Sequence, residues 1–345
     1  MLKDQLDMSM SLITINLVVR NGQKYLRHCL DSIKKQTYQN IEVNIWDNAS
    51  TDSTREIVKK EYPEFNLIEN DTNFGTWVGQ EKALKYSHGE YILAISVDII
   101  LDPKFIEESV KVAEQDPKIG AVQAKIYQYS LTEFETSKNL PAKLIDTCGF
   151  KIFKSRRLIN IGHGEEDRGQ YDNEVEIFGV EGAVPFFRRK TVDDLYIGSE
   201  FADSDFFWYG DDLDIAWRMK LLGWKQIYSP GVIAHHDRQT TKGLGKSRTD
   251  FIKMRRQIPM IKRRLDWRNT TLAIIKNDYL SNFLRDYPYI GWRQFQLWSY
   301  FLIYEPSMIF EIFTIAKLLP SMLKKRREVM CKARVSAKEI HKWFR

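Results

Sequence analysis

Hydrophobic and polar positions alternate along the first part of the chain in a way that predicts strands and helices in turn. Short apolar runs rich in β-branched residues are separated by segments whose apolar residues recur every three or four positions. The predicted strands are Leu12–Val19, Ile41–Trp46 and Phe65–Glu69, with helices at Gln23–Gln36 and Ser53–Glu61. Strands joined by single helices are typical of βαβ units, so the pattern predicts a parallel sheet with helices on its faces.

The next strand is the most apolar of the series. A helix over Trp77–Ser87 leads to Tyr91–Val97, and so few polar residues are typical of a central strand in a parallel sheet. Residues 127–180 are less regular and indicate an insertion or a substrate loop. A helix is then predicted over Leu213–Leu222, followed by a short strand at 224–234.

Beyond residue 249 the pattern changes to basic and aromatic helices. Between residues 307 and 325 the polar residues recur every three or four positions, which leaves a wide apolar face. The longest run there without charge, Gln294–Tyr304, is too short to span a bilayer. We therefore expect an α/β domain over residues 1–249 and a basic, amphipathic helical region over residues 250–345.

Charge is distributed unevenly between these two parts. The net charge is +6, but residues 250–345 carry 20 Lys and Arg against 8 Asp and Glu, whereas residues 1–249 carry 32 against 38. Four consecutive basic residues, Lys324–Arg327, follow the apolar face, so attachment to an anionic membrane surface is one expectation. Packing of that face against the α/β domain is the alternative.

Composition indicates a globular protein of a reducing compartment. The 345 residues are 43% hydrophobic and 13% aromatic, which is enough to fill a sizeable core. Cys29, Cys148 and Cys331 are far apart in sequence, without the spacing of a disulfide framework or a zinc site. The N-terminus has no secretory signal pattern, so a cytoplasmic location is expected.

Polar side chains follow the predicted strands at the points where ligands bind in open α/β sheets. Asn21 follows the first strand, Asp47 and Asn48 close the second, and Asp98 follows the strand Tyr91–Val97. A carboxylate in this position can bind the metal of a metal–diphosphate complex. Ordinary turn chemistry, or a helix N-cap, is the alternative role for these Asn and Asp residues.

A second group of chemically active residues comes later in the chain. Asp211, Asp212 and Asp214 stand together at the start of a predicted helix, where the helix dipole favours negative charge. Crowding raises the pKa of one member, which suits a general base. A capping role suits Asp214 best. One histidine of the pair His235–His236 could bind a metal beside Asp98, although a surface histidine is the commoner outcome.

Taken together, these residues resemble the family 2 glycosyltransferases of GT-A fold, and most of all the rhamnosyltransferase branch. The likeness covers roughly residues 10–240. The motifs that carry it are Leu12–Asn16 with Asn21, Asp47–Asp52, Asn73–Gly75, Gly89–Tyr91, Asp98, Asp167–Asp172, Gly210–Asp214 with Trp217 and Arg218, and His235–His236.

The resemblance implies a fold and a reaction. The fold would be GT-A, a Rossmann-like, mostly parallel sheet flanked by helices, here with a C-terminal helical extension. The reaction would be an inverting transfer of a sugar from a nucleotide-diphosphate donor. Asp212 would accept the proton of the acceptor hydroxyl, while Asp98 and His235 would hold Mg²⁺ or Mn²⁺ at the diphosphate.

The resemblance also implies a donor site. Asp47 and Asn21 would hold the base and the ribose, and Trp208 or Trp217 would help to shape the sugar pocket. The side chains expected at the nucleotide sugar are Asn21, Asp47, Asn48, Asn73, Asp98, Trp208 and Asp211. This chain departs from the family pattern at Ser96 and Val97, where an acid or Asn and a Pro are usual, and the bulk of Trp77 would affect which donor sugar fits.

The rhamnosyltransferase likeness implies dTDP-rhamnose as donor and a hydroxyl of a growing, lipid-linked cell-surface glycan as acceptor. A UDP-hexose or UDP-galactofuranose donor is an alternative, and a non-catalytic scaffold bound to membranes is another. The location expected is the cytoplasm or the cytoplasmic face of the membrane. The partners expected besides the substrates are a membrane surface, through the C-terminal region, and a second copy of the chain. The basic tail first suggests nucleic acid as well, but its wide apolar face favours lipid or internal packing.

Overall fold

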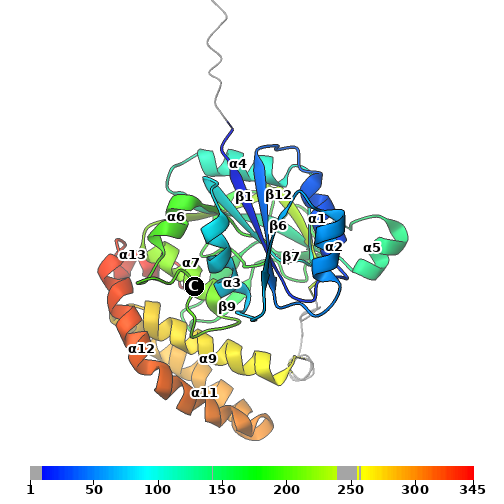
Figure 1. Cartoon of the computed structure of the whole chain (residues 1–345). Coiled ribbons are helices and arrows are strands. Elements are labelled where there is room, and N and C mark those ends of the chain that lie inside the picture. Colours follow the sequence, from blue (N-terminus) through cyan, green and yellow to red (C-terminus); the bar gives the residue numbers. More distant parts are fainter. Residues whose placement is uncertain (1–9, 142, 239–254, 256–257) are drawn as a thin grey trace, which may run out of the picture.

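A mixed sheet with long parallel strands forms the centre of the molecule (Figure 1). The structure is a computed structural model, and it describes residues 10–141, 143–238, 255 and 258–345. Along the sheet the strands follow the order β10-β12-β6-β11-β4-β1-β2-β3, with β5 paired to β12 and β7 paired to β6. The predicted fold, a GT-A-like sheet flanked by helices with a C-terminal helical extension, is confirmed.

The elements follow each other through the chain as the hydrophobic pattern predicts. The strands are β1 Ile13–Val19, β2 Ile41–Asn48, β3 Asn66–Asn70, β4 Tyr91–Ile95, β5 Ile99–Leu101, β6 Ile119–Gln128, β7 Ile145–Thr147, β8 Phe150–Ile152, β9 Leu158–Asn160, β10 Val175–Glu176, β11 Phe186–Arg188 and β12 Lys225–His236. The α-helices are α1 Leu26–Lys34, α2 Thr54–Glu61, α3 Thr76–Ala83, α4 Phe105–Glu114, α5 Leu131–Ser137, α6 Arg189–Asp194, α7 Asp211–Leu221, α9 Met260–Asn277, α10 Leu280–Arg285, α11 Tyr287–Tyr304, α12 Glu311–Lys332 and α13 Ala337–His341. The 3₁₀ helices are η1 Leu84–Tyr86 and η2 Pro306–Phe310.

The parallel part of the sheet brings the predicted ligand-binding residues to one edge. β1 pairs in parallel with both β2 and β4, and Val19 at the end of β1 lies opposite Asp47. The short strand β11 runs antiparallel between β4 and β6. The carboxyl ends of β1, β2 and β4 therefore meet at the edge that faces α9 in Figure 1.

Each face of the sheet is covered by its own helices. Because side chains alternate along a strand, Leu93 and Ile95 of β4 enter one core with α1, α2 and α4, whereas Ile92 and Ala94 enter another with α3, α6 and α7. The expected layers of helix, sheet and helix are present.

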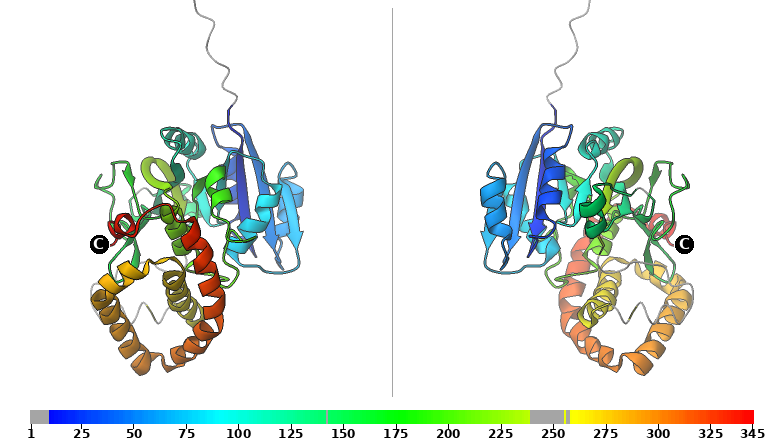
Figure 2. Two further views of the ribbon diagram at one scale, coloured as in Figure 1. Left: turned by 90° about the vertical axis from the view of Figure 1, so that its left-hand side faces the viewer. Right: turned by 90° about the vertical axis from the view of Figure 1, so that its right-hand side faces the viewer.

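The C-terminal helices share a third core with α7. Trp217 of α7 is fully buried there, together with Leu272 of α9, Met322 of α12 and Phe344 near the chain end. Figures 1 and 2 show α9 and α12 alongside this part of the α/β unit, with α11 farther out. Part of the apolar surface of α12 therefore packs against the α/β domain, which was the alternative to membrane attachment. The expected domain boundary near residue 249 lies outside the described residues.

One helix among the described residues, Pro306–Lys332, is long and apolar enough to cross a membrane by length and composition alone. It combines η2 with α12, has a mean hydropathy of 1.3 in its best window, and only 11% of that window is buried.

Candidate functional site

The loops after β1 and β2 are tied to each other at the carboxyl edge of the sheet. Asn21 adopts a left-handed backbone conformation, with φ of 53°. Its Oδ1 accepts from the Thr51 backbone N–H at 2.8 Å, and its own N–H donates to Ser50 Oγ at 2.9 Å. The predicted nucleotide-binding Asn21 therefore fixes the position of one strand-end loop relative to the next.

Asp47 is buried and only half satisfied. Its Oδ2 accepts from Arg55 Nε at 2.5 Å and from the Ser50 N–H at 3.2 Å. Its Oδ1 is buried without any hydrogen-bond partner. Because an unpaired buried acceptor costs free energy, this oxygen is suited to receive an N–H from a nucleotide base.

Asn48 and Asn73 hold the loop that leads into α3. Asn48 Nδ2 donates to Asn73 Oδ1 at 2.9 Å and to the Gly75 carbonyl at 3.0 Å, while its Oδ1 accepts from the Phe74 N–H. Asn73 Oδ1 also accepts from the Gly75 N–H. The polar atoms of Asn48 are therefore occupied within the protein, and its structural role is to position this loop.

Asp98 forms an ion pair with His236, and not with His235 as expected. His236 Nε2 lies 3.4 Å from Asp98 Oδ2, and its Nδ1 lies 2.8 Å from Asp146 Oδ2. Both histidines belong to β12, where neighbouring side chains point to opposite faces. His235 is thus turned away, beside the ring of Tyr127 at 5.7 Å. The candidate metal pair is therefore Asp98 and His236.

The protonation of the two histidines differs accordingly. Burial alone would lower the pKa of His236, but Asp98 and Asp146 raise it to about 10. Burial lowers the pKa of His235 to about 4, and its Nδ1 has no hydrogen-bond partner. Burial alone would raise the pKa of Asp98, but His236 lowers it. The site is a cationic imidazole held between two carboxylates.

This pair fits a divalent cation whose remaining ligands come from outside the protein. The described residues contain no group of three His, Cys, Asp or Glu side chains that would hold a metal by themselves. Asp98 offers a carboxylate, and His236 would offer Nε2 once a bound cation displaces the proton that this nitrogen carries in the cationic imidazole. Asp146 would orient the imidazole through Nδ1, as carboxylates behind metal-bound histidines commonly do. Mg²⁺ and Mn²⁺ usually complete such shells with water and phosphate oxygens.

Arg238 extends this charge network towards Glu181. Its Nε lies 2.7 Å from Asp146 Oδ1, and its Nη2 lies 2.8 Å from Glu181 Oε1. The sequence prediction missed Asp146, Glu181 and Arg238. Arg238 lies just beyond the end of β12, where the alternation of side chains along the strand no longer applies, so no sequence pattern indicated it.

Asp212 begins the helix α7 and lies against Trp77. Its Oδ1 accepts from Trp77 Nε1 at 2.6 Å. A Cβ at Gly182 would overlap the same oxygen, so this close approach requires glycine. Burial and the charge of Glu181 raise the pKa of Asp212 to about 6, against the lowering effect of Trp77 and Arg238. A carboxylate with this pKa is a suitable general base near neutral pH.

The two neighbouring acids have different surroundings. Asp214 is buried and paired with Arg218 and Lys276 at 2.8 Å each, and Asn277 also donates to it. Burial alone would raise the pKa of Asp214, but these cations lower it to about 2, so its role is structural. Asp211 is also buried, and burial together with Asp212 raises its pKa well above the ordinary value.

A strained aromatic loop, residues 206–210, leads into Asp212. Phe207, Tyr209 and Gly210 all have positive φ, at 62°, 63° and 84°. Asn269 of α9 holds the loop: its Nδ2 lies 2.9, 2.9 and 2.6 Å from the carbonyl oxygens of Phe206, Trp208 and Tyr209. No local motif in the sequence indicated Asn269, because its partners lie some sixty residues earlier.

The two tryptophans expected at the sugar pocket have different positions. Trp208 is 39% exposed and lies against Tyr209, with 4.4 Å between ring centroids. Trp217 is wrong as a pocket residue, because it is fully buried and packs edge-on against Phe178 and Phe344. Trp208 is therefore exposed enough to contact a ligand, as is Phe207 of the same loop, which is 46% exposed.

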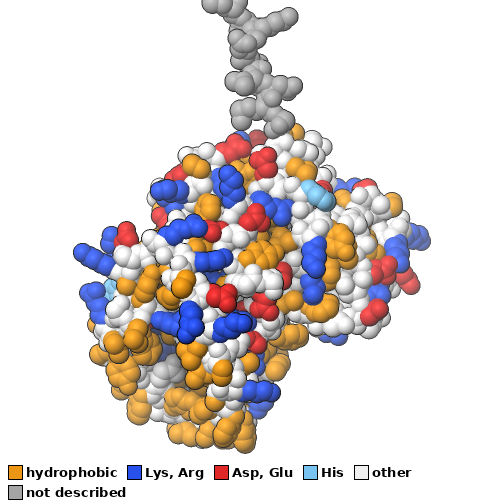
Figure 3. Space-filling view, turned by 60° about the vertical axis from the view of Figure 1, so that its left-hand side comes forward, with side chains coloured by type: hydrophobic (Ala, Val, Ile, Leu, Met, Phe, Trp, Pro, Cys, Tyr) orange, Lys and Arg blue, Asp and Glu red, His pale blue; other side chains and the backbone are white. Residues whose placement is uncertain are grey.

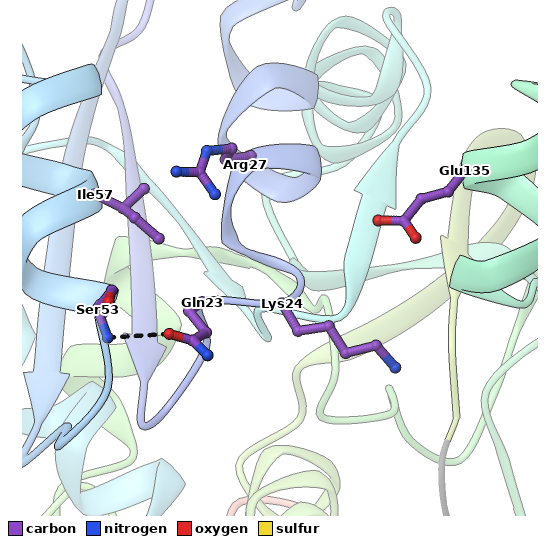
Figure 4. A pocket seen from close by; sticks show the side chains of 6 residues that line it. All are labelled: Gln23, Lys24, Arg27, Ser53, Ile57 and Glu135. Atoms are coloured by element: carbon purple, nitrogen blue, oxygen red, sulfur yellow. Dashed lines mark hydrogen bonds between the residues drawn. The ribbon is translucent and has the colours of Figure 1, made fainter.

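An open groove of about 520 Å³ lies beside this edge of the sheet (Figure 4). It is lined by Gln23, Lys24, Arg27, Ser53, Ile57 and Glu135. Gln23 Oε1 accepts from the Ser53 N–H at 3.1 Å across its floor. The groove adjoins the loops after β1 and β2 but contains neither the Asp98–His236 pair nor Asp212.

The order of strands in the sheet, with polar side chains at its carboxyl edge, is typical of one class of protein, the GT-A glycosyltransferases. The structure of GalNAc-T7 with UDP, GalNAc and Mn²⁺ is similar with a TM-score of 0.58 and 14% identity, over 78% of this chain and 48% of that one. The mannosyltransferase PcManGT of Pyrobaculum calidifontis with GDP-Man and Mn²⁺ is similar with a TM-score of 0.52 and 17% identity, over 93% and 86%. At these identities the likeness shows the fold.

Within that class the chain belongs to glycosyl transferase family 2, whose sequence model matches residues 14–188, more than half of the chain. The glycosyltransferase GlyA of Streptococcus pneumoniae is 32% identical over 131 residues, 37% of this chain and 18% of GlyA. The putative glycosyltransferase EpsH of Bacillus subtilis is 26% identical over 139 residues, 39% of this chain and 38% of EpsH. The matches thus span less than half of these relatives' length.

Proposed function

We propose that this protein is an inverting glycosyltransferase that moves a sugar from a nucleotide-diphosphate donor to a hydroxyl group of a glycan. The observation that carries the proposal is the position of Asp212. Its pKa is raised to about 6, and Glu181 and Arg238, whose charges act on it, connect through Asp146 to the Asp98–His236 pair. A proton acceptor and a site for a metal-bound diphosphate therefore belong to one charge network.

Asp212 performs the proton-transfer step in this mechanism. It takes the proton of the acceptor hydroxyl as that oxygen attacks the anomeric carbon on the side opposite the leaving diphosphate, so the configuration at that carbon inverts. Trp77 N–H holds the reacting carboxylate in place, and Gly182 leaves room for it. Asp98 and His236 would hold Mg²⁺ or Mn²⁺, which neutralises charge on the departing diphosphate when bound.

The donor nucleotide would lie along the loops after β1, β2 and β4. The unpaired Oδ1 of Asp47 would accept from the base, and the Asn21 loop would face the ribose. Asp211 and Trp208 would lie towards the sugar, and Asn48 and Asn73 would shape the site by holding the loop before α3. Similar structures contain UDP or GDP-Man, so a UDP-sugar donor stands beside dTDP-rhamnose, the prediction drawn from the sequence.

A lipid-linked glycan is the acceptor that we infer, with the protein peripheral to the cytoplasmic face of a membrane. The support is the basic, apolar C-terminal region, whose α9 also holds the aromatic loop next to Asp212. A homodimer through the same apolar surface is the competing arrangement.

The variant Asp212→Asn tests the proposed base. We expect transfer to fall by about a thousandfold or more, within the range that a positioned base contributes with its electrostatic effect, while donor binding and the melting temperature are kept. Asp193→Asn, an exposed acid on α6, is the matched control and should retain full activity.

Unchanged transfer in Asp212→Asn would refute the base assignment. If the wild-type chain binds nucleotide sugars but transfers none of a panel that includes dTDP-rhamnose, UDP-hexoses, UDP-galactofuranose and GDP-mannose, the scaffold alternative is correct. Running the panel with Mg²⁺, with Mn²⁺ and with chelator identifies donor and metal in one experiment.

A further inference from the structure

Large apolar side chains gather on the outer end of the C-terminal helices. Six of them, on α11, η2 and α12, are more than 60% exposed: Trp292, Phe295, Leu302, Ile303, Phe310 and Phe313. We call residues 292–313 the apolar tip. Figure 3 shows hydrophobic side chains gathered over this lower end of the molecule, whereas on the α/β part charged, polar and hydrophobic side chains are mixed. Exposed patches of this kind mark interaction surfaces.

Most charged side chains in this part of the chain are buried or half-buried. Between Trp292 and Leu323, a stretch that the structure describes throughout, Lys317 is the one charged side chain that is exposed. Glu305 is buried and paired with Arg263, and Arg293 and Glu311 are half-buried. The exposed surface of the tip is therefore apolar because few of its residues are charged and because those few are turned inwards.

Basic side chains border the apolar tip on both sides along the chain. Arg285 precedes it, and Lys324 and Arg327 follow it, all of them exposed. The surrounding segment, residues 250–345, carries 20 basic against 8 acidic residues. An apolar surface flanked in sequence by exposed basic residues complements an anionic bilayer, in which acyl chains lie below negative headgroups. A second copy would instead bring positive charges towards positive charges.

The second half of α12 is bound to the rest of the protein and cannot cross a bilayer. Lys325 pairs with Asp203 and Asp205, at 2.5 and 3.0 Å, and Met322 and Val329 are buried in the core shared with α7. The residues before these contacts, 306 to 319, are themselves partly packed, since Met308 is buried and Ile315 and Leu318 lie against the cores of the C-terminal region. They number about 14 and would span about 21 Å as an α-helix. A hydrocarbon core is about 30 Å thick, so the tip is suited to lie in the interface.

We propose that the apolar tip inserts into the interfacial layer of an anionic membrane and holds the carboxyl edge of the sheet towards it. In Figure 1 the carboxyl ends of β1 and β2 face α9, and α11 lies beyond α9 on the same side. Delivery of a lipid-linked acceptor to Asp212 by this contact rests on the proposed function. Insertion itself does not.

The experiment is flotation of the full chain with vesicles that contain no acceptor. The vesicles are phosphatidylcholine alone, or phosphatidylcholine with about one third phosphatidylglycerol, at low and high salt. We expect flotation with the anionic vesicles and a tenfold or greater loss of partition in Ile303→Gln/Phe313→Gln, whose side chains are both 70% exposed. Leu144→Gln, 45% exposed on the α/β part, is the control and should float like the wild type.

Two further measurements keep the result decisive. Hydrogen exchange of the wild type should slow within residues 292–313 when anionic vesicles are added. No flotation of the wild type, or equal flotation of the double variant, overturns the proposal. So does a wild-type dimer that the double variant converts to a monomer without any vesicle binding. Transfer to a soluble acceptor should be equal in the wild type and the double variant, and its absence in both would count against the proposed function alone.

Discussion

The proposed donor half of the candidate site, the loops after β1 and β2, and its proposed acceptor half, around Asp212, are built in different ways. On the donor side, short loops after neighbouring parallel strands are linked to each other, as Asn21 is to Thr51. On the acceptor side, the loop before Asp212 is held by Asn269 of α9, and the buried Asp214 by Lys276 of the same helix. The C-terminal region is therefore a structural part of the acceptor half, although the family match ends at residue 188.

We expect the largest effect from removing the positive charge by which α9 is joined to the loop and helix around Asp212. Lys276 is fully buried and paired with Asp203 and Asp214. In Lys276→Met both carboxylates lose this partner, so we expect the free energy of unfolding to fall by about 3–5 kcal/mol, measured by urea denaturation. Lys225→Met removes an exposed pair with Asp116 and should change it by less than about 1 kcal/mol. Equal losses in the two variants would contradict the structural dependence on α9.

The second largest effect should be on metal activation, in the proposed donor half, and it should differ between His235 and His236. We expect His236→Ala to weaken activation by Mg²⁺ or Mn²⁺ by about a hundredfold or more, because it removes a ligand and not only its support. His235→Ala should change metal activation by less than about threefold, since that side chain lies on the other face. The measurement is a metal titration of transfer rate, with melting curves to confirm folding. The reverse order would restore His235 as the ligand.

Asn269→Ala should affect the acceptor half alone. The carbonyl oxygens of the aromatic loop lose their donor, and we expect kcat to fall by about tenfold to a hundredfold with the donor dissociation constant unchanged. Asn282→Ala is the matched control, since Asn282 is also buried and donates to a carbonyl, that of Ala337, away from the site. Both variants should lose stability, but only Asn269→Ala should lose kcat. Equal kcat values in Asn269→Ala and Asn282→Ala would show that Asn269 does not position the aromatic loop for catalysis.

The smallest expected effect is a shift in pH dependence. The active form of Asp212 is the carboxylate, so kcat should rise about tenfold per pH unit at low pH and level off above pH about 6. The Trp77 N–H favours the carboxylate, so Trp77→Phe should raise the pKa and move this limb to higher pH. Trp46→Phe is the control, because Trp46 Nε1 has no hydrogen-bond partner. A shift to lower pH in Trp77→Phe would contradict the assignment.

The sequence predicted what depends on neighbours in the chain. β1 begins at Ile13 where Leu12 was expected, and Asp47 lies at the end of its strand as the parallel βαβ pattern requires. The hydrophobic pattern failed at the histidine pair, where a shift of one residue along the strand moves a side chain to the other face of the sheet. The predicted strand stopped at residue 234, so the alternation that separates His235 from His236 was not applied to them.

Other parts of the site depend on contacts that no local pattern records. Trp217 lies on the side of α7 that the C-terminal helices cover, so its burial follows from packing by residues more than fifty positions later. Asn269 and Asp146 gain their roles in the same way, through partners distant in sequence. Such roles require the tertiary structure.

The attachment of α12 to the acceptor half also has a consequence for how often substrate and enzyme meet. Lys325 joins this helix to Asp203 and Asp205, a few residues before the aromatic loop, so ion pairs connect the helix that carries part of the proposed membrane-binding tip to the proposed acceptor half. An acceptor anchored in the same leaflet would then search in two dimensions at a fixed height below the active site. Its effective concentration would be set by its density in the membrane, and not by the volume of the cell.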